Sequence, residues 1–249
     1  MVWVGFNEQV VYHEEATYGT DASGTRVWIG QVQRFSPSEE RMIHKIYSVG
    51  KGRSMSQNVP GAFKAKGTLE FMMQNGRFLQ YAIGAATTTG SPTYTHAMAT
   101  NDYPLKSVTF QVAQAVSGTA NDYLRYYPGA KVNKATIKFA KEEPISCTID
   151  WIAQNMTPAT AEKSAVSDTA ENVYMFQQGA VTVDGLVIGE TLNGELTIDN
   201  DLYTSHYVDQ TGVQEKIKQP IEQNRKITGN ITMEVSNLTY LNYMRTGSN

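Results

Sequence analysis

The chain has 249 residues, and a hydrophobic content of 41% is enough for a globular core. Its formal net charge is −3, with 21 Lys and Arg against 24 Asp and Glu. A protein that retains DNA by neutralising phosphates carries a clear basic excess. The charge therefore argues against tight, salt-sensitive DNA binding, although contact with DNA without retention stays compatible with it.

The sequence shows no pattern typical of an exported or membrane-inserted protein. The single cysteine, Cys147, can form neither an intrachain disulfide nor a Cys-based zinc cluster. The first residues, "MVWVGFNEQVVYHEEATYGT", lack the basic start and long apolar run of a signal peptide. No apolar stretch approaches the roughly 18 residues of a membrane span. We expect a protein that is made in a cytoplasm and has no membrane partner.

Residues 1–28 read as an extended N-terminal arm, followed by a strand at Ile29–Pro37. A long polar insert, Ser38–Gly61, then precedes the next strand. Inserts of this length form exposed hairpins or loops, which often carry function. Within it, "VGKGRS" (Val49–Ser54) lacks the spacing of a phosphate-binding loop. We predict a flexible hairpin tip whose basic residues suit the acidic surface of a neighbour.

The stretch from Gly67 to Gly84 changes its periodicity halfway. Its first half alternates with a period of two, as in a half-buried strand. After Asn75, a good helix N-cap, the apolar residues fall at helical spacing, and Gly84 ends the pattern. We predict a strand followed by a short helix.

Residues 229–247 repeat this pattern. When residues 67–81 are aligned with residues 229–243, four of fifteen positions are identical. A related strand lies upstream of each copy, at Ile29–Pro37 and Asn193–Asp201. The copies read as the two halves of one sandwich, so we predict a single domain over residues 1–249.

The middle of the chain reads as antiparallel strands with one apolar face each. "QGAVTVDGLVIG" adds two short strands around an Asp184-Gly185 turn. Ala85–Pro104 and Asn155–Val173 are rich in small polar residues and predict loops. The fold class is mainly β: an antiparallel sandwich or barrel with one or two short flanking helices and long loops. The inward residues are Val108, Phe110 and Val112, then Ala135, Ile137 and Phe139, then Ile145, Cys147, Ile149 and Trp151.

A search for catalytic or metal-binding motifs finds none. "HEEAT" has Thr17 where a zinc protease motif needs its second histidine. The stretch from Asp199 has Thr204 and Gln210 where a calcium loop needs Gly and Glu. No G-x-S-x-G is present, and Cys147 alternates with core residues as a small buried hydrophobe. We predict no enzyme activity, no catalytic residue, no metal and no cofactor.

Several weak motifs, in order along the chain, carry a resemblance to a known family. They are "EEATYGT", "NVPGAFKAKGTLEFMMQNGRFLQYAIGA", "DYLRYYPGAKVNKATIKFAKEEPISCTIDWIAQN", and "GELTIDNDL" followed by "NRKITGNITMEV". Together they resemble major tail tube proteins of long-tailed viruses of bacteria or archaea.

The resemblance implies a structural virion protein, assembled in the host cytoplasm and located in the tail. Members form rings, usually hexamers, which stack into a hollow tube with a continuous lumenal barrel. A tape-measure protein occupies the lumen during assembly, terminator and initiator proteins act at the tube ends, and double-stranded DNA later passes without specific binding. Candidate inter-ring contacts are Ile43, His44, Lys45, Tyr47, Lys51 and Arg53, and candidate contacts of the N-terminal arm are Glu15, Tyr18 and Gly19.

Three alternatives stay open at this point. The duplicated halves could let a trimer mimic six-fold symmetry. The chain could form the tube of a contractile tail or injection system, which shares the ring architecture. It could instead be a glycan-binding sandwich that uses the aromatics of "DYLRYY" and "SPTYTH". The alternation of each strand defines two faces, either of which could line a lumen.

Overall fold

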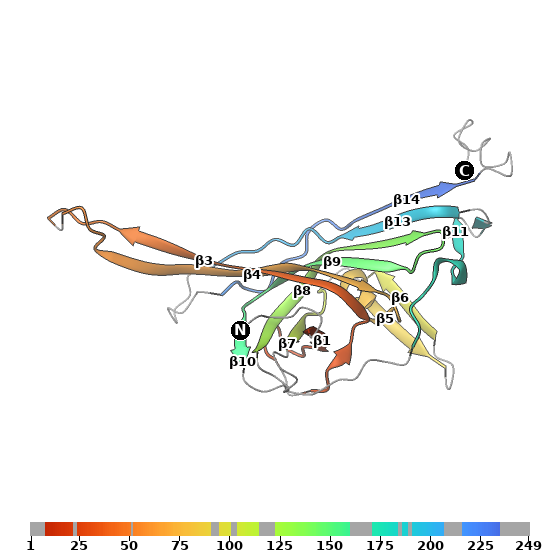
Figure 1. The fold of residues 1–249 in the computed structure, drawn as a ribbon, viewed down its shortest axis with the longest axis horizontal. Helices are drawn as coiled ribbons and strands as arrows, with labels where there is room; N and C mark the ends of the chain where they lie inside the picture. Colours follow the sequence, from red (N-terminus) through yellow and green to blue (C-terminus); the bar gives the residue numbers. More distant parts are fainter. Residues whose placement is uncertain are drawn as a thin grey trace.

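A computed structural model describes residues 8–21, 24–50, 52–90, 95–100, 104–114, 123–159, 171–183, 186–188, 191–206 and 216–234. These residues form a mainly antiparallel β-structure with one 10-stranded sheet and two separate two-stranded hairpins (Figure 1). The strands are β1 (Glu8–Glu14), β2 (Val27–Trp28), β3 (Gln31–Ile46), β4 (Gln57–Met72), β5 (Gly84–Thr89), β6 (Thr95–Thr100), β7 (Val108–Gln114), β8 (Tyr123–Ala140), β9 (Ser146–Ala153), β10 (Thr157–Ala159), β11 (Val181–Val183), β12 (Leu186–Ile188), β13 (Thr191–Asp199) and β14 (Lys226–Met233). Short helices are η2 (Arg77–Leu79), α1 (Gln80–Ile83) and η3 (Phe176–Gln178).

The long strand β8 belongs to two layers. Its first part pairs with β7 and β10, and its second part pairs with β9 and β13. Gly129 has φ +70° at the change of partner, and both neighbouring ladders shift register close by. Bulges of this kind bend a strand and let one sheet fold over a core. One layer follows β2-β1-β7-β8 and the other follows β3-β4-β9-β8-β13-β14, which confirms the predicted antiparallel fold class.

Aromatic side chains fill the space between the layers. Phe35 stacks on Trp151 with ring centroids 5.5 Å apart, and Phe110 meets Trp151 at the same distance. The predicted inward faces of β7 and β9 are buried, including Cys147 at 0% exposure. Burial raises the pKa of the Cys147 thiol to about 12, so the thiol stays protonated and unreactive at neutral pH.

The N-terminal segment is part of the sandwich, which corrects the expectation of an extended arm over residues 1–28. β1 pairs with β7 along its whole length, from Glu8 opposite Gln114 to Glu14 opposite Val108. Val10, Val11 and Tyr12 are buried, so this segment supplies core side chains. Residues 1–7 lie outside the described part of the chain.

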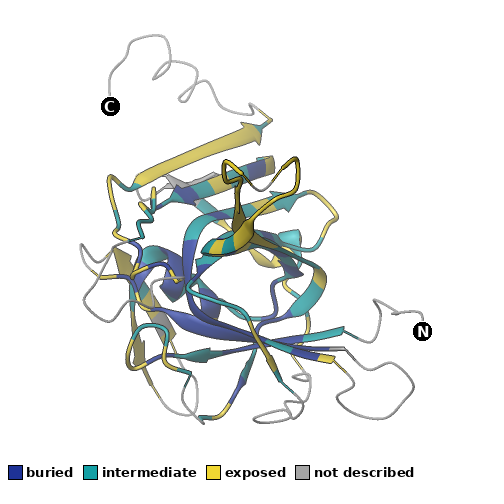
Figure 2. Cartoon of the chain, turned by 90° about the vertical axis from the view of Figure 1, so that its left-hand side faces the viewer, coloured by how far each residue is buried: buried dark blue, intermediate teal, exposed yellow. Residues whose placement is uncertain are grey.

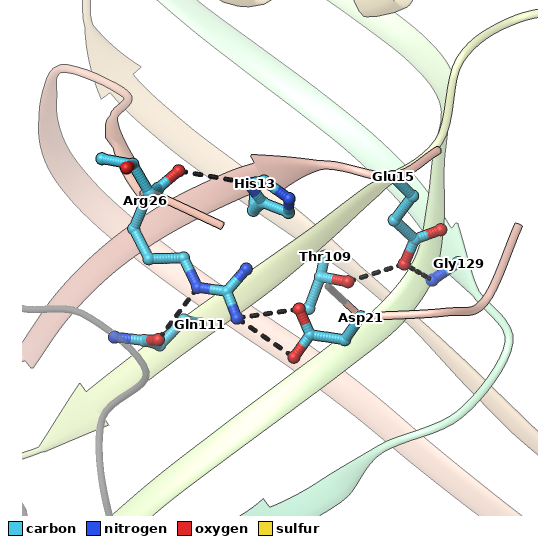
Figure 3. Close-up of polar contacts among 8 residues, drawn as sticks. His13, Glu15, Asp21, Arg26, Thr109, Gln111 and Gly129 are labelled. Atoms are coloured by element: carbon cyan, nitrogen blue, oxygen red, sulfur yellow. Dashed lines mark hydrogen bonds and ion pairs between the residues drawn. The ribbon is translucent and has the colours of Figure 1, made fainter. Parts of the chain in front are cut away.

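Glu15 joins the end of this segment to the bend of β8. Its side chain is buried, and its carboxylate accepts four hydrogen bonds (Figure 3 draws two). One oxygen accepts from Thr109 Oγ1 at 2.6 Å and from the Gly129 N–H at 2.7 Å. The other accepts from Ser107 Oγ at 2.7 Å and from the Gly19 N–H at 2.8 Å. The carboxylate therefore fixes the turn after β1, the start of β7 and the bend of β8 relative to one another.

The residues that follow Glu15, among them Asp21 and Arg26, bury the polar face of β7. Arg26 is 2% exposed, and its guanidinium donates to Asp21 at 2.8 and 3.0 Å and to Gln111 at 3.2 Å (Figure 3). Thr109 and Gln111 are 0% exposed, although alternation with Val108 and Phe110 predicts a solvent-facing position. Both faces of β7 are thus buried, one in the apolar core and the other under charged and polar partners.

A second buried ion pair holds the segment after β13. Lys131 Nζ lies 2.6 Å from Glu222 Oε1, which also accepts the Leu105 N–H at 3.0 Å. Burial lowers the pKa of Lys131, and the Glu222 carboxylate opposes that shift. The pair therefore holds residues near 222 against the middle of β8.

The first copy forms a strand followed by short helices, as predicted. The N-cap is Gly76 and not Asn75, although Asn75 Oδ1 accepts the Arg77 N–H at 3.2 Å, and Gly84 has φ +131° at the end of α1. Ala85–Pro104 differs from its prediction, because β5 and β6 pair in register from Gly84 opposite Thr100 to Thr89 opposite Thr95. Its threonines and alanines are polar or small on both faces, so no apolar alternation marks the strands. In the second predicted loop, Thr157–Ala159 forms β10.

We predict that replacing Glu15 by Gln lowers the free energy of unfolding by about 3 kcal/mol. Each carboxylate oxygen accepts two donors, so an amide NH₂ in either orientation faces two donors that lose their acceptor. Urea denaturation measures the change. The control Glu40→Gln, at an exposed position, should stay within about 0.5 kcal/mol of the parent. An unchanged unfolding midpoint in Glu15→Gln would contradict the central role of this carboxylate.

Candidate assembly surfaces

The hairpin of β3 and β4 extends far beyond the sandwich (Figure 1). Its outer part is coloured as exposed in Figure 2. It carries large apolar side chains in solvent, with Ile43 59%, Tyr47 66% and Val49 107% exposed. Gly50 and Gly52 have φ +87° and +70°, a backbone conformation that glycine adopts readily in a turn. A Cβ atom at either position would have no neighbour within 4 Å, so close packing in the monomer does not require glycine there. A folded monomer gains nothing from this arrangement, so the surface is suited to a partner.

The candidate inter-ring residues lie on this exposed part. Ile43, His44, Lys45, Tyr47 and Arg53 are all exposed, and Lys51 lies outside the described residues. From residue 41 to residue 69 the sequence has six Lys and Arg and no Asp or Glu. That leaves 15 cations and 24 acids, a formal charge of −9, in the rest of the chain. Residues 41–69, which include the outer part of the hairpin, are therefore basic on a chain that is otherwise acidic.

The layer β3-β4-β9-β8-β13-β14 has two open edges. In the described residues, β14 pairs with β13 and with no other strand, and β3 pairs with β4 alone. Every neighbouring pair in this order is antiparallel, so β14 and β3 run in opposite directions. Unpaired N–H and C=O groups on edges of this length favour pairing with another chain.

The apolar, core-facing side of this layer is buried at β4, β9 and β8 and becomes exposed toward β14. One row of directly paired residues crosses the layer from β4 to β14, and exposure rises along it from 0% at Leu69 to 51% at Ile227. Leu196 and Ile231, on the same face, are 38% and 36% exposed. Among the described residues, no element covers the apolar face where it reaches the open edge. The row is Leu69, Ile149, Ala135, Ile198 and Ile227.

The opposite face of the same layer is polar and balanced in charge. One row alternates negative and positive side chains, and the next row is made of threonines, with Thr136 Oγ1 3.3 Å from Thr197 Oγ1. Cross-strand neighbours of opposite charge and paired threonines stabilise such a surface. The charged row is Asp150, Lys134, Asp199 and Lys226, and the threonine row is Thr148, Thr136, Thr197 and Thr228.

The expected contacts of the N-terminal arm lie at the bend of β8. Glu15 is 7% exposed and is saturated by donors of its own chain, which corrects its assignment to a neighbour contact. A Cβ on Gly129 would lie 3.0 Å from the Tyr18 ring, so that ring packs against the bend. Gly19 has φ +70° beside the Gln154 side chain. Tyr18 and Gly19 are partly exposed, and their contact with a neighbour stays a prediction.

The two copies of the repeat occupy different places in the sheet. In each copy the upstream strand pairs antiparallel with the repeat strand, β3 with β4 and β13 with β14. β4 has a second neighbour, β9, whereas β14 lies at an open edge. The predicted second helix falls in residues 235–249, outside the described part of the chain.

The features expected of other protein classes are weak. In "DYLRYY", Tyr126 and Tyr127 are 5% and 0% exposed, so they cannot form a flat glycan-binding patch; residues 91–94 of "SPTYTH" lie outside the described ranges. Where the structure describes the chain, no group of three His, Cys, Asp or Glu side chains could hold a metal ion. Within the same ranges no helix has the length and apolar character to cross a membrane.

Comparisons with known proteins identify the family. The family described as phage tail tube protein matches residues 5–249, and the chain belongs to it. The chain is similar to the SPP1 tail tube, solved by solid-state NMR and cryo-EM, at 12% identity and a TM-score of 0.43, over 74% of this chain and 96% of that chain. It is also similar to a chain of the anti-feeding prophage (AFP) baseplate, at 8% identity and a TM-score of 0.39, over 61% of this chain and 92% of that chain. No curated protein matches the chain with significance.

Family membership gives the protein a structural role in the phage virion tail and confirms the resemblance seen in the sequence. The family is one of structural proteins and not of enzymes. The sequence located the exposed hairpin but missed the open edge at β14. "KITGNITM" alternates like any half-buried strand. The sheet order shows that it lies at an edge of the described sheet, and the exposure of Ile227 and Ile231 shows that its apolar face is only partly buried.

Proposed function

We propose that this protein forms rings, hexameric by the family resemblance, that stack into the hollow tail tube through which double-stranded DNA passes. The observation that carries the proposal is a layer whose two edge strands, β3 and β14, have one partner each among the described residues, with an apolar face that becomes exposed toward β14. A heterologous contact that joins one edge to the other closes into a ring when its rotation closes. A trimeric ring is the alternative outcome.

In the ring, β14 of one subunit pairs with β3 of the next. Their opposite directions continue the antiparallel alternation of the layer across the junction. The junction supplies partners for the open backbone groups and covers Ile227 and Ile231, which are 51% and 36% exposed in the monomer. Closure of the sheet removes both edges at once.

The polar face of the joined layer lines the channel. The apolar face is occupied by the core, so it must point outward from the lumen. Alternating Asp150, Lys134, Asp199 and Lys226 give this wall no net charge along the row. A wall without a basic excess does not bind phosphates tightly, which suits rapid passage of DNA.

The projecting hairpin links successive rings, and further tail proteins complete the assembly. The exposed apolar residues Ile43, Tyr47 and Val49 provide the area that such a contact needs. A tape-measure protein occupies the channel during assembly, and terminator and initiator proteins close the two ends of the tube. DNA is a transient occupant without a binding site.

We predict that Ile227→Asp prevents ring closure while the monomer stays folded. The side chain is half-exposed in the monomer, so the free energy of unfolding should change by less than about 1 kcal/mol. A charge at the junction is left without solvent or partner once the ring closes. Light scattering after gel filtration measures the oligomer. The control Thr228→Asp, on the channel face, should form rings like the parent; failure of both variants, or success of both, would contradict the assigned faces.

We further predict that deletion of Ile43–Arg53 leaves a folded subunit that no longer forms tubes. The deleted residues contribute nothing to the core, because those that are described lie in solvent. Negative-stain electron microscopy over a range of concentrations tests this and gives the ring symmetry by rotational averaging. The control Ser54→Ala/Ser56→Ala keeps the hairpin length and should form normal tubes. Normal tubes from the deletion variant would remove the hairpin from ring stacking.

A further inference from the structure

A groove lies at the end of β4 that is opposite to the hairpin tip. Three segments meet beside it through backbone hydrogen bonds: the Met73 N–H donates to Ile145 at 3.0 Å, the Ile145 N–H to Tyr174 at 2.8 Å, and the Tyr174 N–H to Met73 at 2.7 Å. The groove has a volume of about 570 Å³. It is lined by Gln74, Ile145, Glu171, Asn172, Tyr174, Met175, Gln178 and Gly179.

The groove is lined by apolar side chains and by one acidic residue, Glu171. Tyr174 is 43% exposed, and Ile145 and Met175 are partly buried beside it. Glu171 lines the groove, and its backbone oxygen accepts from Gln74 Nε2 at 2.6 Å, which holds the segment in place. Glu143 is exposed in the adjoining turn, where its backbone oxygen accepts the Phe176 N–H at 3.1 Å. Glu143 lines a separate hollow with Lys138, and the Glu171 carboxylate also accepts from Asn75 Nδ2 at 3.4 Å. An apolar surface with carboxylates beside it is the complement of an apolar and basic partner.

The groove and the hairpin tip lie at opposite ends of the subunit, as a contact that repeats from ring to ring requires. Gln74 follows the last residue of β4 by two positions, and the hairpin tip precedes its first residue. β4 has 16 residues, so the two surfaces lie roughly 50 Å apart along one strand direction, at about 3.3 Å per residue. Figure 1 shows the tip and the turn between β8 and β9, which adjoins the groove, at opposite ends of the longest axis. Two complementary surfaces at opposite ends of one subunit generate an open stack.

We propose that this groove receives the β3–β4 tip of a second copy of the chain in the adjacent ring. Ile43, Tyr47 and Val49 of the tip cover the apolar part of the groove at Ile145, Tyr174 and Met175. Lys45 and Arg53 meet Glu171 at the groove and Glu143 in the adjoining turn. The inference rests on the proposed stacking of rings and names the surface on which each ring docks.

Charge reversal tests the pairing. The tip variant Lys45→Glu/Arg53→Glu and the groove variant Glu143→Lys/Glu171→Lys should each form rings but lose tubes. A variant with all four substitutions should recover tubes, because the pairing is restored with its signs exchanged. The control Lys216→Glu, an exposed cation outside both surfaces, should form tubes like the parent. Electron microscopy and sedimentation give the tube yield for each variant.

A cross-link tests the contact itself. A chain with Val49→Cys and Gln178→Cys should give a ladder of covalent multimers from assembled tubes on a non-reducing gel. Cys147 does not compete, because the thiol is buried and its pKa is raised to about 12. The control pair Val49→Cys and Thr89→Cys, which places the second thiol on the β5–β6 hairpin, should remain monomeric on the gel.

Recovery of tubes by the four-fold variant, or a ladder specific to the groove cysteine, supports the inference. Tubes from all variants with no groove-specific ladder would overturn it and would leave ring closure through β14 intact. If the two charge variants fail and the four-fold variant also fails, the ladder decides: its absence overturns the inference. If the parent chain forms neither rings nor tubes, the proposed function fails and this inference fails with it.

Discussion

The bend of β8 at Gly129 depends on the buried carboxylate of Glu15. The backbone N–H at the bend points toward that carboxylate, and two hydroxyls from the start of β7 share it. Because β8 supplies strands to both layers, this contact decides how the layer β2-β1-β7 lies over the layer that contains β3, β4, β9, β13 and β14. A buried charge is tolerated here because four donors satisfy it.

The folded subunit leaves edge backbone groups and large apolar side chains available for assembly. Inside the subunit, even the polar face of β7 is covered, and its side chains find charged partners such as Arg26. At β14 and at the hairpin the opposite holds, since these edges have no further partner in the described part of the chain and large apolar side chains lie in solvent. A stable monomer would suppress such surfaces by charge or by covering them. Their presence on a well-packed sandwich agrees with a role in the phage tail tube family.

The sequence predicted those features that depend on local patterns. Alternation identified the inward faces of β7, β8 and β9, Gly84 marked the end of the short helices, and composition identified the exposed insert at Ser38–Gly61. The predicted N-cap, Asn75, lies one residue before the observed N-cap, Gly76. The prediction from sequence failed where a residue is buried by a partner that is distant in the sequence. Thr109 and Gln111 read as solvent-facing, yet Glu15 and Arg26 cover them. The threonine-rich β5–β6 hairpin has no apolar face and so gave no strand signal.

The most direct test is a cryo-EM reconstruction of tubes formed by the purified parent protein. Our account predicts rings in which β14 of each subunit adds to β3 of its neighbour, with Thr136, Thr197 and Thr228 facing the channel. It also predicts that the β3–β4 hairpin crosses to the next ring. A lumen lined by the β1–β7 layer, or a β14 edge left in solvent on the outer wall, would contradict it.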